Sequence, residues 1–317
     1  MKNVSLRQLR AISAIEETGK IINAAKRLGL TGPAVTLQLR QLEDELGATL
    51  FDRTPEGMRL TDAGRIVLDA AKSVQDRLAA MAEAIDAAKG VHSGSLRLGV
   101  VSTAKYFAPR LISAFLKIHP AVRLKLTVGN RARTISALQD RAIDIALMGR
   151  PPRDFPVRSM VFGDHPLVII APQGHPLAKK RGITKEMLIP ETFLIREQGS
   201  GTRMSLELFF SDIPEKREKF GTELDSNETI KQAVIAGLGI AFISAHTIEQ
   251  ELQLGKLVIL DVEGMPIRRQ WFSVSRAAQA PTPMMAAFND FLFRQGPSHL
   301  PVISNPYPEA AMDAPKP

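Results

Sequence analysis

The stretch "INAAKRLGLTGPAVTLQLRQLEDELG", residues 22–47, decides the fold of the first part of this 317-residue chain. The small pair Ala24-Ala25 leaves room for another helix to cross closely, and Leu28-Gly29-Leu30 forms a tight turn. Thr31 is suited to cap a new helix, and Pro33 then falls in its first turn, where the missing N–H costs little. The stretch therefore predicts two short helices joined by a turn.

The second of these helices has two unlike faces. One face is an apolar stripe with 4-3-4 spacing, formed by Val35, Leu39, Leu42 and Leu46. The opposite face carries Pro33, Thr36, Leu37 and Arg40. A helix-turn-helix enters the major groove of DNA with such a polar face, close to the N-terminus of its second helix. A three-helix bundle with a solvated face gives the same pattern, so the helices alone leave both interpretations open.

The flanking segments favour DNA binding. Upstream, Leu6, Leu9, Ile12 and Ile15 recur at helical spacing and predict a preceding helix. Downstream, residues 50–61 predict a hairpin with Pro55-Glu56-Gly57 at its turn. Such a hairpin can act as a wing, and Arg53 and Arg59 are placed to contact the minor groove or the phosphates.

The helix predicted from residue 61 to residue 90 has a regular apolar seam. Its members alternate by four and three, and they are Val67, Ala71, Val74, Leu78, Met81, Ile85 and Ala88. This is the pattern of a helix that pairs with a partner helix. Packing against its own domain is the alternative, but the strict seam and the following break at Gly90–Gly94 favour a homodimer.

The composition is that of a globular protein without disulfides. Hydrophobic residues make up 44% of the chain and charged residues 23%, and cysteine is absent. The net charge is +8, but residues 1–95 hold 13 basic and 12 acidic side chains, whereas residues 96–317 hold 28 and 21. The surplus of positive charge therefore lies mostly in the second part of the chain. No apolar run is long enough to cross a bilayer, and no signal-peptide core is present, so we expect a cytoplasmic protein without membrane contact.

Beyond residue 94, β-branched runs alternate with helical patterns. The strand-like runs are "LRLGVVS", "LKLTVG", "IDIALMG", "PLVIIAP", "TFLIRE", "GIAFIS", "LVILDV" and "QWFSVS". Helical patterns lie near residues 105–118, 131–141, 203–211, 228–236, 245–253 and 282–294. This alternation predicts α/β sheets wound with helices, in two small subdomains.

Ligands of open α/β sheets bind beyond the carboxyl ends of the strands, and several loops qualify there. Turns of small residues at helix starts, with arginines nearby, suit an anion. The candidate effector-binding residues are Ser102, Thr103, Arg131, Arg150, Gly199, Ser200, Gly201, Thr202, Arg203 and Asn227. Capping and turn roles explain each loop singly, but the positive surplus in this part favours an anionic effector, phosphorylated or carboxylated.

At this point a family resemblance is evident. "NAAKRLGLTGPAVTLQLRQLEDELGATLFDR" followed by "LTDAG" resembles the LysR-type transcriptional regulators, and the chain is most similar to the branch that regulates Calvin-cycle carbon-fixation operons. The resemblance implies an N-terminal all-α winged helix-turn-helix with a long linker helix, and a C-terminal α/β sensor of two lobes like a periplasmic binding protein. It also implies operator DNA as a partner and a dimer of dimers, a homotetramer.

The expected boundaries follow from this resemblance. Residues 1–60 form the DNA-binding domain, 61–90 the linker and dimerisation helix, and 91–295 the effector-binding domain. One lobe comprises 95–163 and 273–295, and the other 164–272, while 296–317 form a disordered tail. The expected DNA-binding residues are Thr31, Gly32, Pro33, Thr36, Leu37, Arg40, Arg53 and Arg59. Gly32 and Leu37 stand where the family often has polar residues, and Glu56 where a basic residue is frequent, so the operator sequence does not carry over.

Two other classes of protein fit this sequence less well. An enzyme is disfavoured because the six histidines are scattered, with neither metal-ligand spacing nor a nucleophile motif, and we expect no metal and no cofactor. A solute-binding protein of a transport system would share the sensor architecture. It would need an export signal, however, and it has no use for a helix-turn-helix.

Overall fold

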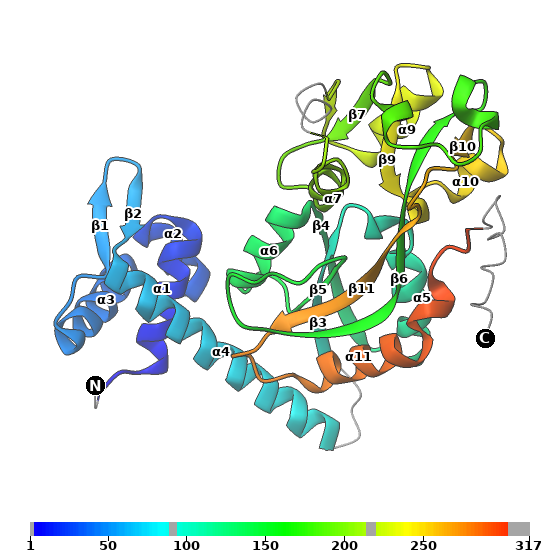
Figure 1. Ribbon diagram of the computed structural model, residues 1–317. Coiled ribbons are helices and arrows are strands. Elements are labelled where there is room, and N and C mark those ends of the chain that lie inside the picture. Colours follow the sequence, from blue (N-terminus) through cyan, green and yellow to red (C-terminus); the bar gives the residue numbers. More distant parts are fainter. Residues whose placement is uncertain (1–2, 89–93, 214–219, 304–317) are drawn as a thin grey trace, which may run out of the picture. The chain divides into compact units, whose positions relative to one another are not determined.

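The computed structural model describes residues 3–88, 94–213 and 220–303. The chain forms two compact units, Met1–Ile85 and Asp86–Pro317, called here the N-terminal and the C-terminal unit (Figure 1). Within the described ranges, no helix combines the length and the apolar character that crossing a membrane requires.

Three helices build the N-terminal unit, α1 (Leu6–Thr18), α2 (Ile21–Leu28) and α3 (Gly32–Leu46). Each ends at a glycine in the left-handed conformation, which a residue without a side chain adopts at no steric cost. The stripe predicted on α3 lies in the core, because Val35, Leu39 and Leu42 are buried against Ile12 and Ile15 of α1. The predicted helix-turn-helix is therefore confirmed, except that Leu6 of the expected α1 stripe is exposed.

The predicted hairpin consists of the antiparallel strands β1 (Phe51–Thr54) and β2 (Gly57–Leu60). It is fixed to the turn between α1 and α2, since the Met58 N–H donates to the Gly19 carbonyl at 2.8 Å. Gly57 has a φ of 143°, and a Cβ there would lie 2.4 Å from the Gly19 carbonyl oxygen. The close contact between wing and helices therefore depends on the absence of a side chain at Gly57.

The long helix α4 (Asp62–Ala88) uses its apolar seam in two ways. Ala71 is buried in the core of its own unit, and Val67 packs against that core. Met81 and Ile85, further along the same seam, are 54% and 46% exposed. The expectation that the whole seam pairs with a partner is therefore wrong for its first part, where the alternative of packing within the domain holds. The side chain of Ala88 lies outside the described residues.

The C-terminal unit is built on one connected sheet. Its strands are β3 (Gly94–Val101), β4 (Val122–Gly129), β5 (Ile145–Met148), β6 (Val157–Pro172), β7 (Phe193–Arg196), β8 (Glu223–Leu224), β9 (Ile240–Ser244), β10 (Leu257–Ile259) and β11 (Ile267–Arg276). They run in the order β4-β3-β5-β11-β6-β9-β7-β8, and β10 also pairs with β6. The helices are α5 (Ala108–Ile118), α6 (Arg131–Gln139), α7 (Gly201–Phe209), α9 (Asn227–Ile235), α10 (Glu249–Gln253) and α11 (Pro283–Gln295). Short 3-10 turns are η1 (Ala104–Tyr106), η2 (Pro176–Lys179), η3 (Glu186–Leu188), η4 (Ala245–Thr247) and η5 (Gly296–His299).

The sheet carries two lobes, as Figure 1 shows, and the lobes have separate hydrophobic cores. In the first lobe, β3, β4 and β5 are covered by α5, α6 and α11, and Phe107, Phe115 and Phe288 fill the core. In the second lobe, the alternating side chains of β6 enter cores on both faces of the sheet, with Ile169 on one face and Ile170 on the other. The predicted two-lobed α/β architecture is confirmed.

The antiparallel pair β6–β11 connects the two lobes. The pairing runs from Val157 to Leu167 on β6 and from Arg276 back to Ile267 on β11. Sequence patterning located only the second half of β6, because the first half, "VRSMVFGDH", mixes charged residues and glycine with apolar ones. The short strand β8 also escaped prediction.

The predicted disordered tail is wrong for residues 296–303. The turn η5 follows α11 directly, and Leu300 is buried, 9% exposed, in the first core. A Cβ on Gly163 would lie 2.4 Å from the Leu300 side chain, so this part of the tail packs closely against β6. Residues 304–317 lie outside the described residues.

The contact of Gly57 with Gly19 yields a stability prediction. Gly57→Ala adds a methyl group against a backbone oxygen and places a side chain at a positive φ. We expect a loss of roughly 1–3 kcal/mol in the free energy of unfolding, measured by urea denaturation. Gly174→Ala is the control, since nothing lies within 4 Å of its Cβ position. Equal stability of both variants would contradict the close contact.

Candidate DNA-binding face and effector pocket

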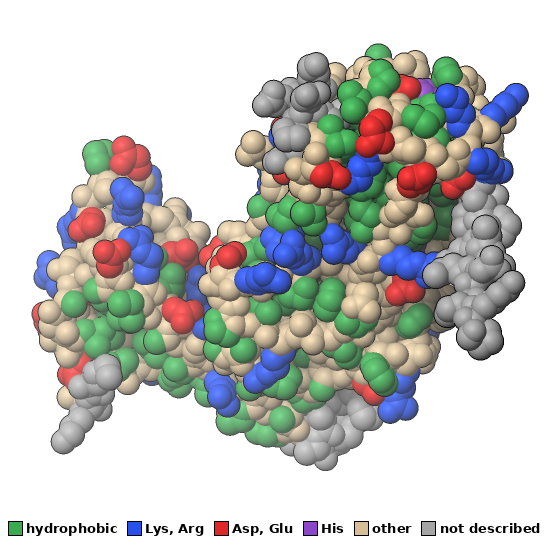
Figure 2. Space-filling view, in the orientation of Figure 1, with side chains coloured by type: hydrophobic (Ala, Val, Ile, Leu, Met, Phe, Trp, Pro, Cys, Tyr) green, Lys and Arg blue, Asp and Glu red, His purple; other side chains and the backbone are tan. Residues whose placement is uncertain are grey.

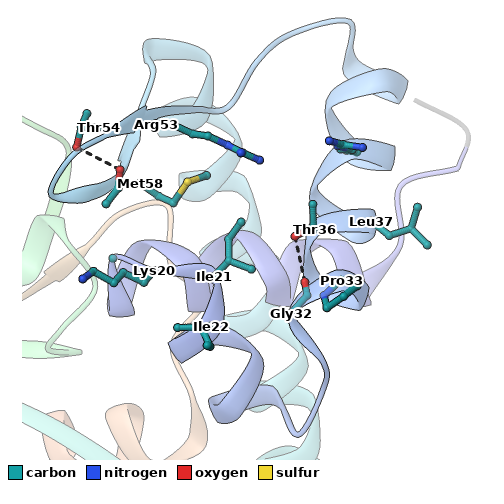
Figure 3. Close-up of a pocket in the computed structure, with 13 residues that line it drawn as sticks. Lys20, Ile21, Ile22, Gly32, Pro33, Thr36, Leu37, Arg53, Thr54 and Met58 are labelled. Carbon is teal, nitrogen blue, oxygen red and sulfur yellow. Dashed lines mark hydrogen bonds between the residues drawn. The ribbon is translucent and has the colours of Figure 1, made fainter.

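A hollow of about 980 Å³ lies between α3 and the wing in the N-terminal unit (Figure 3). Six of the eight expected DNA-binding residues line it: Gly32, Pro33, Thr36, Leu37 and Arg40 from α3, and Arg53 from β1. In Figure 3 the side chain of Arg53 extends from the wing toward α3. The hollow therefore combines the exposed face of α3 with a wing arginine.

Local hydrogen bonds fix the start of α3. Thr31 caps the helix by accepting a hydrogen bond from the Ala34 N–H at 3.4 Å, and the Thr36 hydroxyl donates to the Gly32 carbonyl at 3.0 Å. Thr31 caps the helix and does not line the hollow. Because both bonds are local, they set the helix start independently of any partner.

Arg59 departs from expectation. It pairs across the hairpin with Asp52, whereas Arg53 pairs with Met58, so the two arginines lie on opposite faces of the wing. Arg59 is exposed but does not line the hollow. The expected contacts of Arg53 and of Arg59 with DNA would therefore be made from different faces of the wing.

The hollow also contains residues that sequence patterns did not select as site residues. Lys20, at the N-cap of α2, lines it together with Ile22, which is 64% exposed. Lys20, Arg40 and Arg53 supply positive charge, and the residues that line the hollow include no Asp or Glu. A concave basic surface of this kind suits the phosphate backbone of DNA. The sequence feature that could have indicated Lys20 as a site residue is its position just ahead of a short predicted helix.

In the C-terminal unit, a pocket of about 580 Å³ lies between the two lobes. The structure brings seven of the ten expected effector residues to its lining: Ser102, Thr103, Arg131, Arg150, Ser200, Gly201 and Thr202. They come from the end of β3, the start of α6, the loop after β5 and the start of α7. On the face shown in Figure 2, Lys and Arg side chains form a band across this unit, between its two lobes.

Positive charge dominates the pocket. Its lining contains five arginines, Arg131, Arg150, Arg153, Arg268 and Arg269, and one acidic residue, Asp164. Burial lowers the pKa of Arg131, and the neighbouring charge of Arg150 lowers it further. Because these cations repel each other, an anion bound between them would be stabilised. The pocket therefore favours an anionic ligand.

Three expected effector residues do not line the pocket. Arg203 is held by ion pairs with Glu207, at 2.9 Å, and with Glu223. These hydrogen bonds, the one to Glu207 first, raise its pKa. Because Arg203 is engaged by these two carboxylates and does not line the pocket, the expectation that it binds the effector is not met in this structure.

Gly199 and Asn227 belong instead to the junction of the lobes. The Gly199 carbonyl accepts a hydrogen bond from the Ala132 N–H at 3.2 Å. Asn227 is 1% exposed, accepts a hydrogen bond from Arg196 and donates to the Thr103 hydroxyl at 3.5 Å. The buried Arg196 also donates to the Ser102 hydroxyl at 3.2 Å. These hydrogen bonds join the second lobe to Ser102 and Thr103, which follow β3 and line the pocket.

The strands β6 and β11 provide a wall of the pocket that sequence patterns did not predict. His165 lies directly across from Arg269 in the antiparallel pair, and both residues line the pocket. Burial, followed by the charges of His246 and Arg269, lowers the pKa of His165 to about 3, so the ring is neutral at physiological pH. The adjacent pair Arg268-Arg269 ahead of an apolar strand was the signal available in the sequence.

Comparison with known proteins decides the family. Residues 6–65 match the model of the bacterial regulatory helix-turn-helix protein, lysR family, and residues 89–297 match that of the LysR substrate binding domain. The chain belongs to the LysR family. The resemblance predicted from the sequence is thereby confirmed, and the alternative of a transport solute-binding protein is not supported.

This LysR-family regulator has close relatives. It is 61% identical over 311 residues to the HTH-type transcriptional regulator CbbR of Sinorhizobium medicae, which covers 98% of this chain and 99% of the relative. It is 45% identical over 293 residues to the RuBisCO operon transcriptional regulator of Allochromatium vinosum, covering 92% and 97%. These relatives are named as transcriptional regulators and not as enzymes.

A solved structure supports the fold of the C-terminal unit. The regulatory domain of Synechocystis CcmR, in complex with 2-PG (2-phosphoglycolate), is 35% identical and has a TM-score of 0.59. The match covers 63% of this chain and 96% of that domain. Effector domains of this family therefore include one that has been seen with a small phosphorylated ligand.

The placement of Arg203 yields a second prediction. Arg203→Ala removes the cation between Glu207 and Glu223, so we expect a loss of roughly 0.5–2 kcal/mol in the free energy of unfolding. Arg150→Ala, in the pocket, serves as the comparison. With millimolar inorganic phosphate as the probe, the phosphate-induced rise in Tm should persist in Arg203→Ala and shrink in Arg150→Ala. A phosphate-induced rise in Tm that shrinks in Arg203→Ala and persists in Arg150→Ala would instead show that Arg203 binds the anion.

Proposed function

We propose that this LysR-family regulator binds operator DNA of carbon-fixation genes and responds to a small phosphorylated carboxylate held between the lobes of its C-terminal unit. The gene class is supported by the names of its relatives, CbbR and the RuBisCO operon regulator, over nearly their full lengths. The ligand class is supported by 2-PG in the regulatory domain of CcmR. Such a regulator acts on chromosomal DNA and therefore in the cytoplasm.

The positive charge of the pocket supports the proposed class of effector. Five arginines and one aspartate line the pocket, and this surplus of positive charge favours a ligand with more than one negative charge. Guanidinium groups form paired hydrogen bonds with phosphate and carboxylate oxygens, which a neutral sugar or an aromatic ring cannot accept in the same way. A volume of about 580 Å³ suits a small metabolite.

We assign operator contact to the hollow of the N-terminal unit. In this proposal α3 enters the major groove, with Thr36 and Arg40 toward the bases or phosphates, and Arg53 reaches the backbone or the minor groove from the wing. The exposed Leu37, at 56%, and Ile22 offer apolar contacts at the same surface. Lys20 adds a further cation on the α2 side.

The experiment is a fluorescence anisotropy titration with promoter DNA from the organism's own RuBisCO operon, with and without 2-phosphoglycolate. We expect the ligand to change the affinity or the footprint of the wild type. Arg40→Ala should weaken binding about tenfold or more at unchanged Tm, because the side chain is exposed and touches no core. Arg59→Ala, on the other face of the wing, is the charge-matched control and should weaken binding less. Specific binding that Arg40→Ala leaves intact would contradict the DNA assignment.

We further propose a homodimer formed through the exposed end of the α4 seam, and a homotetramer built from two such dimers. Support comes from Met81 and Ile85, two large apolar side chains that remain about half exposed after the first part of the seam has entered the core. Paired helices would bury both residues. A dimer also has two DNA-binding domains, as an operator with two half-sites requires.

Met81→Asp tests this assembly. The side chain is exposed, so the fold should tolerate the change, whereas a carboxylate in a paired seam is costly to desolvate. Sedimentation velocity should show dissociation to a smaller species and a loss of affinity for two-half-site DNA. Ile66→Asp, at a residue 73% exposed on the same helix but off the seam, should sediment like the wild type. Unchanged sedimentation of Met81→Asp would rule out pairing at this end of α4.

A further inference from the structure

His165 is a polar side chain in an unusual environment. It is 7% exposed and forms part of the wall of the pocket between the lobes. Within the part of the chain that the structure describes, neither of its ring nitrogens has a hydrogen-bond partner. A neutral imidazole offers one donor and one acceptor, and a buried polar group left without a partner destabilises the folded state.

The residues that pack closest to the His165 ring do not supply that partner in the described structure. One face of the ring stacks on Trp271 at a centroid distance of 3.9 Å and an angle of 17°. The indole N–H of Trp271 is already used, because it donates to Nδ1 of His246 at 3.0 Å. On another side Nδ1 of His165 faces Gly149, where a Cβ would lie only 2.7 Å away. The ring is thus held by aromatic and backbone packing, without a polar contact.

The two neighbouring histidines therefore differ in kind. His246 is 5% exposed and is paired with Trp271, so it has a structural hydrogen bond. His165 is equally buried and unpaired, but it lies at the pocket, directly across from Arg269. A position kept only for packing could hold an aromatic ring without nitrogens, such as the somewhat larger phenylalanine, which avoids the cost of unpaired nitrogens.

We propose that His165 is a ligand-recognition residue of this pocket: its neutral imidazole donates a hydrogen bond to an anionic oxygen of the effector, beside the guanidinium of Arg269. The proposal rests on the effector class proposed above and assigns the anionic group of the ligand to the β6–β11 wall. His165 lines the pocket, but both of its ring nitrogens are buried in the unliganded structure. In this proposal the side chain shifts toward the pocket on binding, and a ligand oxygen at that wall supplies the missing partner.

The neutral state of the ring fits this role. Burial and the nearby charges of His246 and Arg269 keep its pKa near 3, so the ring carries no charge of its own at neutral pH. Charge neutralisation is left to the arginines, and His165 contributes a directional donor. A directional donor discriminates between ligands by where their oxygens lie, which a set of flexible arginines does less well.

The test compares three full-length variants with the wild type, using 2-phosphoglycolate as the probe in isothermal titration calorimetry and thermal unfolding. His165→Phe keeps the ring and its stacking on Trp271. We expect its unliganded Tm to equal or exceed that of the wild type, while affinity for the probe falls about tenfold. His165→Gln, which restores an N–H donor, should bind with intermediate affinity. His246→Phe, the matched control, should lower the Tm because the Trp271 N–H loses its partner, and it should affect affinity less than His165→Phe.

The outcomes separate the inference from the proposed function. If the wild type binds the probe but His165→Phe binds equally well, or if His165→Phe loses stability as His246→Phe does, His165 is structural and the inference is wrong, while the effector class stands. If the wild type binds neither 2-phosphoglycolate nor other phosphorylated carboxylates, the effector class fails and the inference fails with it. A ligand-induced change in the ¹⁵N shifts of the His165 ring, absent for His246, is the direct signature expected.

Discussion

The antiparallel pair β6–β11 is the constraint on which the C-terminal unit depends. Both strands pass from one lobe into the other, so the two cores share a continuous piece of backbone. The register shifts between Trp271 and Phe272, next to the point at which His165 stacks on Trp271. Because the lobes are joined there, the space between them has a fixed wall, and the remaining lining comes from loops that each lobe carries to that wall.

This arrangement explains why a basic pocket forms where it does. The first lobe brings Arg131 and Arg150 to the edge of the sheet, β11 brings Arg268 and Arg269, and the second lobe brings the small residues Ser200–Thr202 at the start of α7. Hydrogen bonds from Arg196 to Ser102, and from Asn227 to Thr103, tie the lobes together beside the pocket. A ligand that balances the charge of the arginines therefore contacts groups from both lobes at once. Its binding free energy then depends on the position of one lobe relative to the other.

Local patterns predicted much of this from the sequence, and tertiary pairing accounts for what they missed. The cap at Thr31, the α3 stripe and the strand-end loops depend on neighbours a few residues away, so their positions could be predicted. Arg203 was not assigned correctly, because the i,i+4 pairing with Glu207 was not considered and the other partner, Glu223, is brought close only by the fold. His165 and Arg269 were missed for the same reason: their shared place in the pocket follows from strand register, which no single segment reveals. The α4 seam was periodic throughout, but periodicity does not tell a core of the same chain from a partner.

Hydrogen–deuterium exchange of the full-length protein tests the central claim, that the pocket at the β6–β11 wall is the effector site. The comparison is with and without saturating 2-phosphoglycolate. Protection should appear in the loops that line the pocket, residues 149–153 and 200–205, and in the strand segments 164–167 and 268–272, and should be absent from the outer surface of α5. Binding of the ligand with protection confined to other segments, and none at these four, would contradict the account.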